Sequence, residues 1–347
     1  MSKVNRVWVM NKYADGPMEN DNLVLKEFPL ADAQEGQIRV RSMYLSLDPT
    51  NRVWLSSQFT YLPPIPMGGP MRGFIIGVVD QSRAEGWTVG DIAYGVMQWA
   101  DYCVIDPKQT SYMTKMSQKD GIPLEAWMSA LTMNGETAYY GMLIKGRPKA
   151  GETVLISGAA GATGVLAGQL AKIAGTRVVG IAGGPEKCRA LTEEFGFDAA
   201  IDYKQGNLIA AIQGACPNGV DVFFDNVGGE TLDAALANIA MGGRVVVCGG
   251  ISEYDKFGDP ASIYGLKNYF ALLLKRASME GFVIFDFIGS LEHAKCQRSL
   301  MDWYRAGKLR YRAHVVNGME QAFPSLRLLL TGGNKGKLVV RICDEIK

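Results

Sequence analysis

Histidine is scarce in this chain, and the residue types that bind metals are scattered. Among its 347 residues there are two histidines, His293 and His314, and six cysteines. No two cysteines form a C-x-x-C pair, whereas structural zinc sites need such clustered ligands. Widely spaced cysteines in a chain of this size are typical of reduced thiols. The sequence therefore predicts neither a disulfide framework nor a metal site.

A long hydrophobic run and an excess of one charge are also missing. No stretch approaches the roughly 18 apolar residues of a membrane-spanning helix, and residues 1–15 lack the apolar core of a signal peptide. The formal net charge is +1, from 36 basic and 35 acidic residues, which favours neither nucleic acid nor a membrane as a partner. We expect a cytoplasmic protein that acts on a small molecule.

The length and the pattern of the first third predict a β-rich domain within a two-domain protein, since single cores rarely exceed about 250–300 residues. Segments 38–47, 74–79 and 90–94 are short, apolar or alternating, and bounded by Gly, Pro or Asp, as in the strands of a small barrel. The Pro- and Gly-rich segment 61–73 is expected to be a surface loop, where binding residues often lie.

From about residue 125 onward, apolar runs alternate with helical stretches. Strands are expected at 153–157, 177–182, 199–203, 220–226 and 243–248, with helices between them. Such alternation predicts a parallel sheet covered by helices on both faces. The tail from residue 307 differs, with a helix around 319–331 and a last strand at 337–342, and we expect it to return to the first domain.

A glycine-rich turn, Gly158-Ala-Ala-Gly161-Ala-Thr-Gly164, joins the first of these strands to a helix. Glycines in this context let the backbone approach a pyrophosphate, and the helix N-terminus offers free N–H groups and a partial positive charge. The alternative is a turn that is rich in glycine for tight packing alone. The strand–turn–helix context favours a dinucleotide site.

The segment 180–187 predicts which dinucleotide binds. NAD enzymes usually carry an acid at the end of the second strand, but this strand ends in glycines, and Lys187 follows one turn later. Lys187 is suited to the 2′-phosphate of NADPH, and Tyr203 at the end of the third strand is a second candidate. Glu186 could instead hold a ribose, and Lys187 could be a solvated surface residue. We expect NADP(H).

The chain resembles the medium-chain dehydrogenase/reductase superfamily. Within it, the chain is most similar in its motifs to the zinc-independent branch of prostaglandin, 2-alkenal (double-bond) and curcumin reductases. The resemblance covers nearly the whole chain. It is carried by M-Y-L-S-L-D-P at 43–49, G-E-T-A-Y-Y-G at 135–141, S-G-A-A-G-A-T-G at 157–164, F-D-N-V-G-G-E at 224–230, M-E-G-F at 279–282 and G-N-K-G-K-L-V-V at 333–340.

The resemblance implies an α/β fold with two domains. A GroES-like β-barrel catalytic domain would comprise residues 1–128 and 302–347, and a Rossmann-type doubly wound parallel sheet, residues 129–301, would bind NADPH. Cofactor and substrate would meet in the cleft between them. The cofactor-binding residues expected from the glycine motif and the resemblance are Gly158, Gly161, Ala162, Thr163, Gly164, Lys187, Tyr203, Asn226, Met133, Thr137, Cys248, Ser252, Phe282 and Asn334.

The implied activity is NADPH-dependent reduction of the carbon–carbon double bond of a small apolar α,β-unsaturated ketone or aldehyde. Hydride would reach the β-carbon, a proton would reach the α-carbon, and a donor would stabilise charge on the carbonyl oxygen. Three tyrosines are candidate donors, although each could equally be a packing residue: Tyr269, Tyr264 and Tyr61. A further tyrosine that relatives carry after Asp48-Pro49 is Thr50 here, so the expected substrate preference is not carried over.

Two other functions remain open, a quinone reductase on the same fold and a non-catalytic NADPH-binding protein, because fold alone does not settle function. A homodimer is expected as well. Segments 244–248 and 282–287 are strongly β-like, and an unpaired apolar edge strand tends to pair with another chain.

Overall fold

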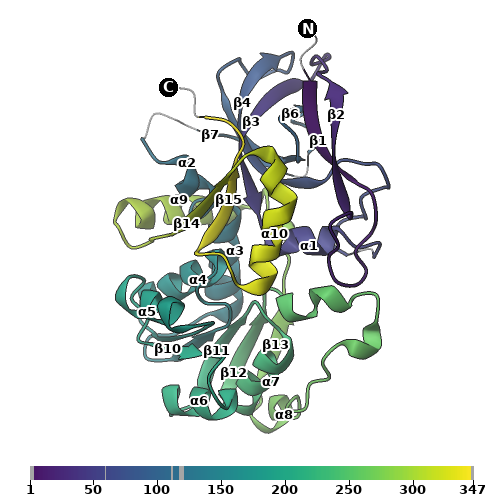
Figure 1. The fold of residues 1–347 in the computed structure, drawn as a ribbon. Coiled ribbons are helices and arrows are strands. Elements are labelled where there is room, and N and C mark those ends of the chain that lie inside the picture. Colours follow the sequence, from purple (N-terminus) through teal and green to yellow (C-terminus); the bar gives the residue numbers. More distant parts are fainter. Residues whose placement is uncertain (1–3, 59, 111, 117–120, 345–347) are drawn as a thin grey trace.

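The chain forms two lobes, one above the other in Figure 1, and each is built around one large sheet. The computed structural model describes residues 4–58, 60–110, 112–116 and 121–344. Both termini lie in the upper lobe, which is antiparallel except for its edge, and the middle of the chain forms the lower lobe around a parallel sheet. The α/β class predicted from the sequence is confirmed.

The upper lobe is built from an early hairpin and a larger sheet. The hairpin is β1 (Val4–Met10) with β2 (Leu23–Pro29). The larger sheet has the order β14-β15-β3-β4-β5-β7, and β6 also pairs with β3. Its strands are β3 (Ile38–Leu47), β4 (Arg72–Ser82), β5 (Ile92–Gln98), β6 (Tyr102–Ile105), β7 (Met113–Met116), β14 (Ala313–Asn317) and β15 (Lys337–Arg341).

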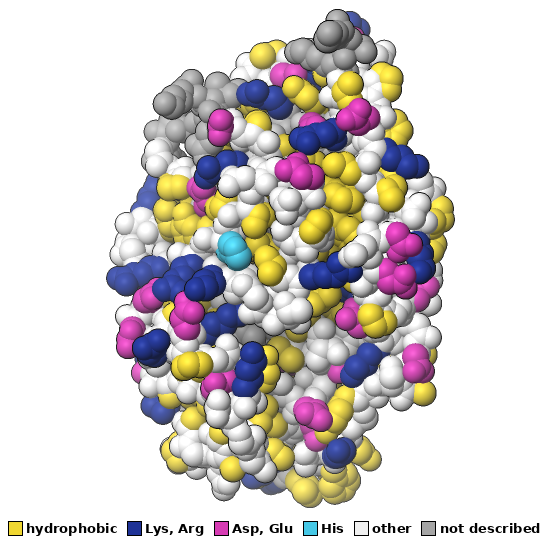
Figure 2. Space-filling model, viewed as in Figure 1, with side chains coloured by type: hydrophobic (Ala, Val, Ile, Leu, Met, Phe, Trp, Pro, Cys, Tyr) yellow, Lys and Arg dark blue, Asp and Glu magenta, His cyan; other side chains and the backbone are white. Residues whose placement is uncertain are grey.

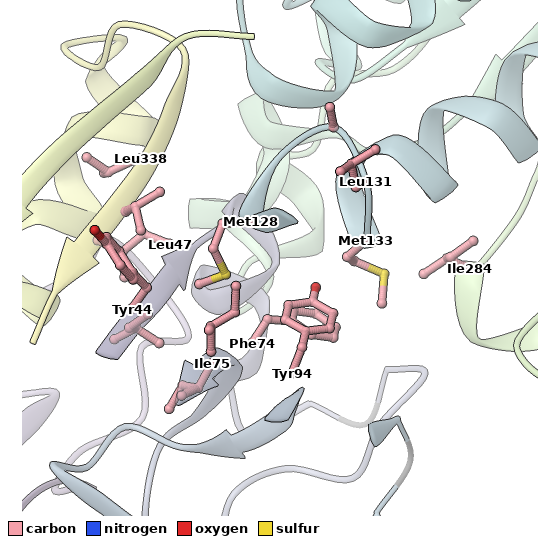
Figure 3. Packing of buried hydrophobic residues seen from close by; sticks show 14 of the residues in the cluster. Tyr44, Leu47, Phe74, Ile75, Tyr94, Met128, Leu131, Met133, Ile284 and Leu338 are labelled. Atoms are coloured by element: carbon pink, nitrogen blue, oxygen red, sulfur yellow. The ribbon is translucent and has the colours of Figure 1, made fainter. Parts of the chain in front are cut away.

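The C-terminal strand β15 joins the two ends of the chain. It pairs antiparallel with β3, with Leu338 opposite Leu47. Figure 3 shows these two residues in the same buried cluster. The pairing places the residues that follow β3 beside those that precede β15, some 290 positions apart in the sequence.

The lower lobe contains a six-stranded, all-parallel sheet in the order β10-β9-β8-β11-β12-β13. The order reverses between β8 and β11, and ligands of such sheets bind outside the carboxyl ends of the strands at this point. The strands are β8 (Thr153–Ile156), β9 (Arg177–Ala182), β10 (Ala199–Asp202), β11 (Val220–Asp225), β12 (Ile239–Val247) and β13 (Ser278–Gly281).

Helices cover this sheet and connect the lobes. Those between and after the parallel strands are α4 (Ala162–Ile173), α5 (Pro185–Glu193), α6 (Leu208–Ala215), α7 (Gly229–Ala237), α8 (Ala271–Leu274) and α9 (Leu291–Arg305). The others are α1 (Pro49–Trp54), α2 (Leu124–Met128), α3 (Met133–Tyr139), the π-helical η2 (Tyr140–Gly146), α10 (Ala322–Thr331) and the 3-10 turns η3 (Ile251–Lys256), η4 (Pro260–Ser262), η5 (Ile284–Asp286) and η6 (Met319–Gln321). Within the described ranges, every helix is too short or too polar to span a membrane.

The β-like segment 282–287 does not form the strand that its composition predicts. Strand β13 ends at Gly281, and residues 284–286 form the turn η5. The aromatic side chains serve packing instead: a Cβ added to Gly141 would lie 2.7 Å from the Phe282 ring, so the glycine leaves room for that ring. Tertiary contacts therefore override the local β-propensity here.

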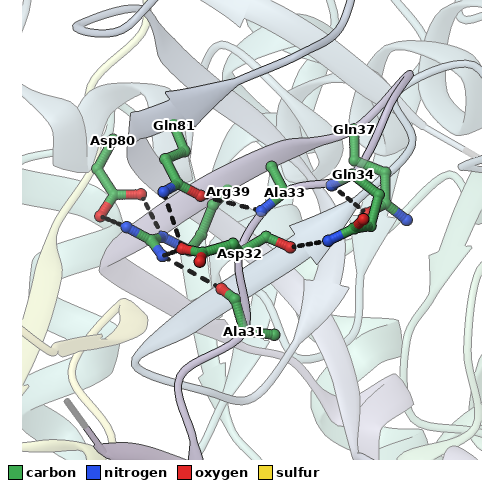
Figure 4. A network of polar contacts seen from close by, with 8 residues as sticks. All are labelled: Ala31, Asp32, Ala33, Gln34, Gln37, Arg39, Asp80 and Gln81. Atoms are coloured by element: carbon green, nitrogen blue, oxygen red, sulfur yellow. Dashed lines mark hydrogen bonds and ion pairs between the residues drawn. The ribbon is translucent and has the colours of Figure 1, made fainter. Parts of the chain in front are cut away.

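The upper lobe also has a polar anchor on its outer side. Arg39 of β3 pairs with Asp80 of β4 at 2.8 Å and with Asp32 at 3.0 Å. Gln81 receives the amide of Ala33 at 2.9 Å and donates to Asp32. Figure 4 shows how these contacts hold the segment before β3 against the sheet. This network lies away from the cleft described next and is structural.

Candidate functional site

A cavity of about 570 Å³ lies at the carboxyl ends of the parallel strands, where the upper lobe meets the lower one. Its walls include segment 158–164 after β8, segment 226–231 after β11 and segment 329–338, which leads into β15. The predicted cofactor residues that line it are Gly158, Gly161, Ala162, Thr163, Gly164, Lys187, Tyr203, Asn226, Ser252 and Asn334.

The glycine-rich turn forms the floor of the cavity. Helix α4 starts at Ala162 with Gly161 as its N-cap, and no side chain caps it. The first N–H groups of a helix have no partner within it, so here they are available to a ligand. A Cβ at Gly164 would lie 2.5 Å from the Gly158 oxygen, and Gly158 has a φ of 57°. The turn therefore needs glycine for its shape, and that shape suits a pyrophosphate.

Two lysines, one predicted and one missed, lie together at one end of the cavity. Lys187 donates to the carbonyl of Gly332 at 2.8 Å. Burial and the nearby charge of Lys204 lower the pKa of the Lys187 amine. Lys204 also lines the cavity. Two mutually repelling cations favour an anionic ligand. In the sequence, only the position of Lys204 directly after Tyr203 pointed to this residue.

Glu186, the residue that could have held a ribose, points elsewhere. Its carboxylate accepts from Lys335 at 2.7 Å and lines a second cavity of about 380 Å³ beside the first. The hydrogen bond from Lys335, and then its charge, lower the pKa of Glu186. The glycines before it make room for Tyr203, since a Cβ at Gly183 would lie 2.8 Å from that ring. The strand end thus suits a 2′-phosphate and not a ribose diol.

Asn226 is fixed at the end of β11 by a buried network. Its Nδ2 donates to the Ser157 carbonyl at 2.7 Å. The adjacent Asp225 is fully buried, accepts from the Ser157 hydroxyl at 2.7 Å and receives the amides of Val227 and Gly228. Burial raises the pKa of this carboxyl. The two strands β8 and β11 are tied together where the cavity begins.

A buried ion pair that the sequence did not reveal forms part of the cavity wall. Asp48, just after β3, pairs with Lys337 at the start of β15, and Asn134 of α3 donates to the same carboxylate at 3.1 Å. Asn134 also reaches the Thr163 hydroxyl at 3.3 Å. Burial raises the pKa of Asp48, but the charge of Lys337 together with the hydrogen bonds from Lys337, Ser46 and Asn134 outweighs it, and the net pKa is lowered. Upper and lower lobes are connected here through polar side chains.

The remaining predicted cofactor residues are not among those that line the cavity. Thr137 donates its hydroxyl to the Met133 carbonyl at 2.6 Å within α3. Phe282 packs on Gly141. Burial raises the pKa of the Cys248 thiol to about 12, so this thiol stays protonated at neutral pH. Their assignment to the cofactor site remains a prediction.

The three candidate tyrosines occupy different places. Tyr264 lines the cavity, but its hydroxyl donates to Asp233 at 3.3 Å. The hydroxyl of Tyr61 meets that of Thr50, whose neighbour Pro49 lines the cavity. Burial raises the pKa of Tyr61, which keeps its hydroxyl protonated. Tyr269 is 60% exposed and lies outside the cavity lining.

An aromatic wall extends from Tyr61 across the two lobes. We define it as Trp54, Tyr61, Phe74, Tyr94 and Phe285. The Phe285 ring lies 6.1 Å from Tyr61 and 6.4 Å from Phe74, and Phe74 stacks on Tyr94 at 5.9 Å. Figure 3 shows Phe74 and Tyr94 side by side, near Met133 and Ile284. Trp54, Phe74 and Tyr94 are buried, so most of the wall belongs to the hydrophobic core of the upper lobe.

Tyr254 is another residue that the sequence analysis missed. Its hydroxyl accepts the Gly250 amide at 3.2 Å, and burial raises its pKa. Tyr254 also raises the pKa of Tyr61 electrostatically, so the two phenols lie near one another. Its position shortly after Cys248 and Ser252, two residues expected to bind the cofactor, was the available signal.

Metal ligands do not gather in this region. Among the residues that the structure describes, no group of three or more His, Cys, Asp and Glu side chains is placed to hold a metal ion. The six cysteines are all unpaired.

Two family models match the chain. Residues 6–113 match a family described as the N-terminal domain of oxidoreductases, and residues 162–303 match a family described as zinc-binding dehydrogenases. The zinc in that second description does not fit the donor set of the described residues.

Individual proteins resemble the chain over nearly its full length. It is 36% identical to an NADPH-dependent curcumin reductase of Escherichia coli and 37% identical to a 2-alkenal reductase (NADP(+)-dependent) of Nicotiana tabacum, in both cases over 98% of each chain. The crystal structure of CurA from Vibrio vulnificus in complex with NADPH superimposes with a TM-score of 0.90 at 33% identity, covering 98% of this chain and 100% of that one.

Proposed function

Because the chain belongs to the medium-chain dehydrogenase/reductase family, we propose that it is an NADP(H)-dependent reductase of the carbon–carbon double bond of α,β-unsaturated ketones or aldehydes. The observation that carries the proposal is the juxtaposition of a nucleotide-type cavity and a phenol donor. The cavity of about 570 Å³ at the carboxyl ends of the parallel strands has two lysines at one end and adjoins the hydroxyl of Tyr61 through Pro49 and Thr50.

The named relatives support this proposal. A curcumin reductase and a 2-alkenal reductase both align with the whole chain, and both names specify the phosphorylated nicotinamide cofactor. The acid-free end of β9 and the lysine pair agree with that choice.

The residues present fit NADP(H). The uncapped N-terminus of α4 would hold the pyrophosphate, and Lys187, Lys204 and Tyr203 would hold the 2′-phosphate. Asn226, Ser252 and Asn334 would contact the rest of the molecule. We further assign Asp48, Asn134 and Lys337 to orient the cofactor between the lobes. When bound, NADPH supplies the hydride for the β-carbon of the substrate.

The chain's own contribution is proton transfer and charge stabilisation. Charge that develops on the carbonyl oxygen needs a donor in a site that excludes water. We assign this role to the protonated hydroxyl of Tyr61, oriented by Thr50. Tyr264 is the second candidate, with its hydroxyl already engaged by Asp233. Tyr269 is the third, and reaching a substrate would require it to leave its exposed position. No step uses a metal.

We also propose a cytoplasmic homodimer. Hydrophobic side chains are exposed on and around α8 and the edge strand β13, and Figure 2 shows such side chains at the lower end of the molecule, where Figure 1 places α8. They are Tyr269, Phe270, Leu273, Leu274 and Met279. An exposed apolar edge favours pairing with a second copy. Six free thiols favour a reducing compartment.

The test is consumption of NADPH with a 2-alkenal, a diaryl enone and a quinone, each repeated with NADH, followed by identification of the product. A saturated ketone or aldehyde formed with NADPH preferred would support the proposal. Turnover of the quinone alone would replace it with quinone reduction. Tight NADPH binding without any turnover would indicate a non-catalytic protein.

A further inference from the structure

An ion pair joins the two lobes next to the cavity. Arg52 lies on α1, at the lower edge of the upper lobe (Figure 1), and its Nε donates to the carboxylate of Asp255 in η3 at 2.6 Å. Pro49 of α1 and several residues of η3 line the cavity, whereas Arg52 and Asp255 themselves do not. The pair therefore connects two walls of the cavity from outside it.

The arginine side of this pair is held in place by the upper lobe alone. The Arg52 side chain is fully buried, and its two terminal nitrogens donate to the carbonyls of Ala14, at 2.8 Å, and of Gly16. The Asp15 carboxylate between them accepts the amide and the hydroxyl of Ser57, each at 2.8 Å. Arg52 is thus fixed before it meets Asp255, which lowers the entropy cost of forming the pair.

The aspartate side is built for release. The Asp255 side chain is 41% exposed, so water can replace Arg52 as its partner when the two separate. Arg52 then keeps a nearby acid. Burial raises the pKa of Asp15, but hydrogen bonds from two serines and the charge of Arg52 outweigh it, and the net pKa is lowered. Separation therefore leaves neither charge without a partner.

A backbone contact accompanies the ion pair. The amide of Gly258, just beyond η3, donates to the Asp15 carbonyl at 2.6 Å. A Cβ added to Gly258 would lie 2.6 Å from that same oxygen, so this close approach of the lobes needs glycine. We call the Arg52–Asp255 pair and the Asp15–Gly258 hydrogen bond together the clasp.

We propose that the clasp must open before NADP(H) can enter or leave, so that Arg52 and Asp255 set the rate at which the cofactor exchanges. This rests on the proposed function, since it takes the cavity for the NADP(H) site. Both are positioning residues, because neither lines the cavity. The clasp should therefore hold the lobes closed equally well with and without the cofactor. A weaker clasp should speed entry and release by the same factor and leave the dissociation constant unchanged.

The experiment measures both rates by stopped-flow fluorescence of NADPH, as its association with the protein and its displacement by excess NADP⁺. Calorimetry gives the dissociation constant. In Asp255→Asn we expect both rates to rise about tenfold, the lower end of what a charge-assisted hydrogen bond contributes. Gly258→Ala weakens the backbone contact without leaving a buried charge, and both rates should rise about threefold.

Asp32→Asn is the matched control, because it removes an exposed acid from another buried arginine, Arg39, within the upper lobe. It should change neither rate. Wild-type rates in both Asp255→Asn and Gly258→Ala would overturn the clasp. A faster release with an equally weaker dissociation constant would overturn it too, since the pair would then contribute to binding and not to opening.

Enone turnover, measured in parallel, separates this proposal from the proposed function. Accelerated exchange in both variants without reduction of any enone by the wild type would contradict the reductase and support the clasp. Enone reduction with unchanged exchange rates would overturn the clasp alone.

Discussion

The two halves of the cleft are built in different ways. The nucleotide half is made mostly of backbone: the glycine turn, the N-terminus of α4 and the ends of three parallel strands. The half that we propose for the substrate is made of side chains from distant segments, with Tyr61 and Thr50 in front of the buried aromatic wall. A backbone site depends on a local motif and tolerates little variation, whereas a side-chain site can change its specificity by single substitutions.

The largest effect should come from the donor in the substrate half. Tyr61→Phe removes the hydroxyl that we assign to the carbonyl oxygen, and general acid groups contribute about 10²–10⁴-fold. We expect kcat for an enone to fall by about 100-fold or more, with little change in the dissociation constant for NADPH. A larger fall in Tyr264→Phe or Tyr269→Phe, measured in parallel, would move the donor to that residue.

A substitution at the junction between the halves, where Asp48 pairs with Lys337, should lower the free energy of unfolding. Asp48→Asn leaves the amine of Lys337 buried without its counter-charge, and breaking one side of such a pair costs about 3–5 kcal/mol. Urea denaturation would measure the loss. Asp32→Asn, which removes a mostly exposed partner of Arg39, is the matched control and should cost no more than about 1 kcal/mol. Equal losses would show that the junction is no more important than the outer anchor.

In the nucleotide half, Lys187→Met should lower the preference for NADPH over NADH. The loss of one charge-assisted hydrogen bond to the 2′-phosphate corresponds to about 10- to 100-fold in the ratio of KM values. Lys335→Met removes a nearby lysine that is engaged by Glu186 and should change the ratio little. An unchanged ratio in Lys187→Met would transfer the role to Lys204.

The smallest effect concerns pH. Burial raises the pKa of Asp198, but hydrogen bonds from the Val178 amide and Lys172 outweigh it, and the net pKa lies below the ordinary 3.8. A carboxyl with a lowered folded pKa stabilises the protein above its unfolded pKa, and the contribution is lost as the pH falls through the folded value. Asp198→Asn should therefore cost about 1 kcal/mol at pH 7 and less below pH 3.8. A constant cost across this range would contradict the assignment.

Local pattern predicted much of the fold. Strands 38–47 and 177–182 have the bounds expected from their apolar residues and flanking turns. The β-like character of segment 282–287 did not lead to a strand. Its side chains pack against α3 and the π-helical η2 instead of extending the edge of the sheet. Periodicity reports the faces that a segment buries, not the partner it meets.

By itself, the sequence determined the glycine turn, the acid-free strand end and the position of Lys187, because each is a local feature whose geometry follows from a few adjacent residues. Only the tertiary structure decided that Asp48 meets Lys337, that Tyr61 meets Thr50 and that Arg72 stacks on Trp54. These pairs come from segments that are brought together by sheet pairing and loop packing. Their contacts depend on the whole fold, which no short stretch of sequence specifies.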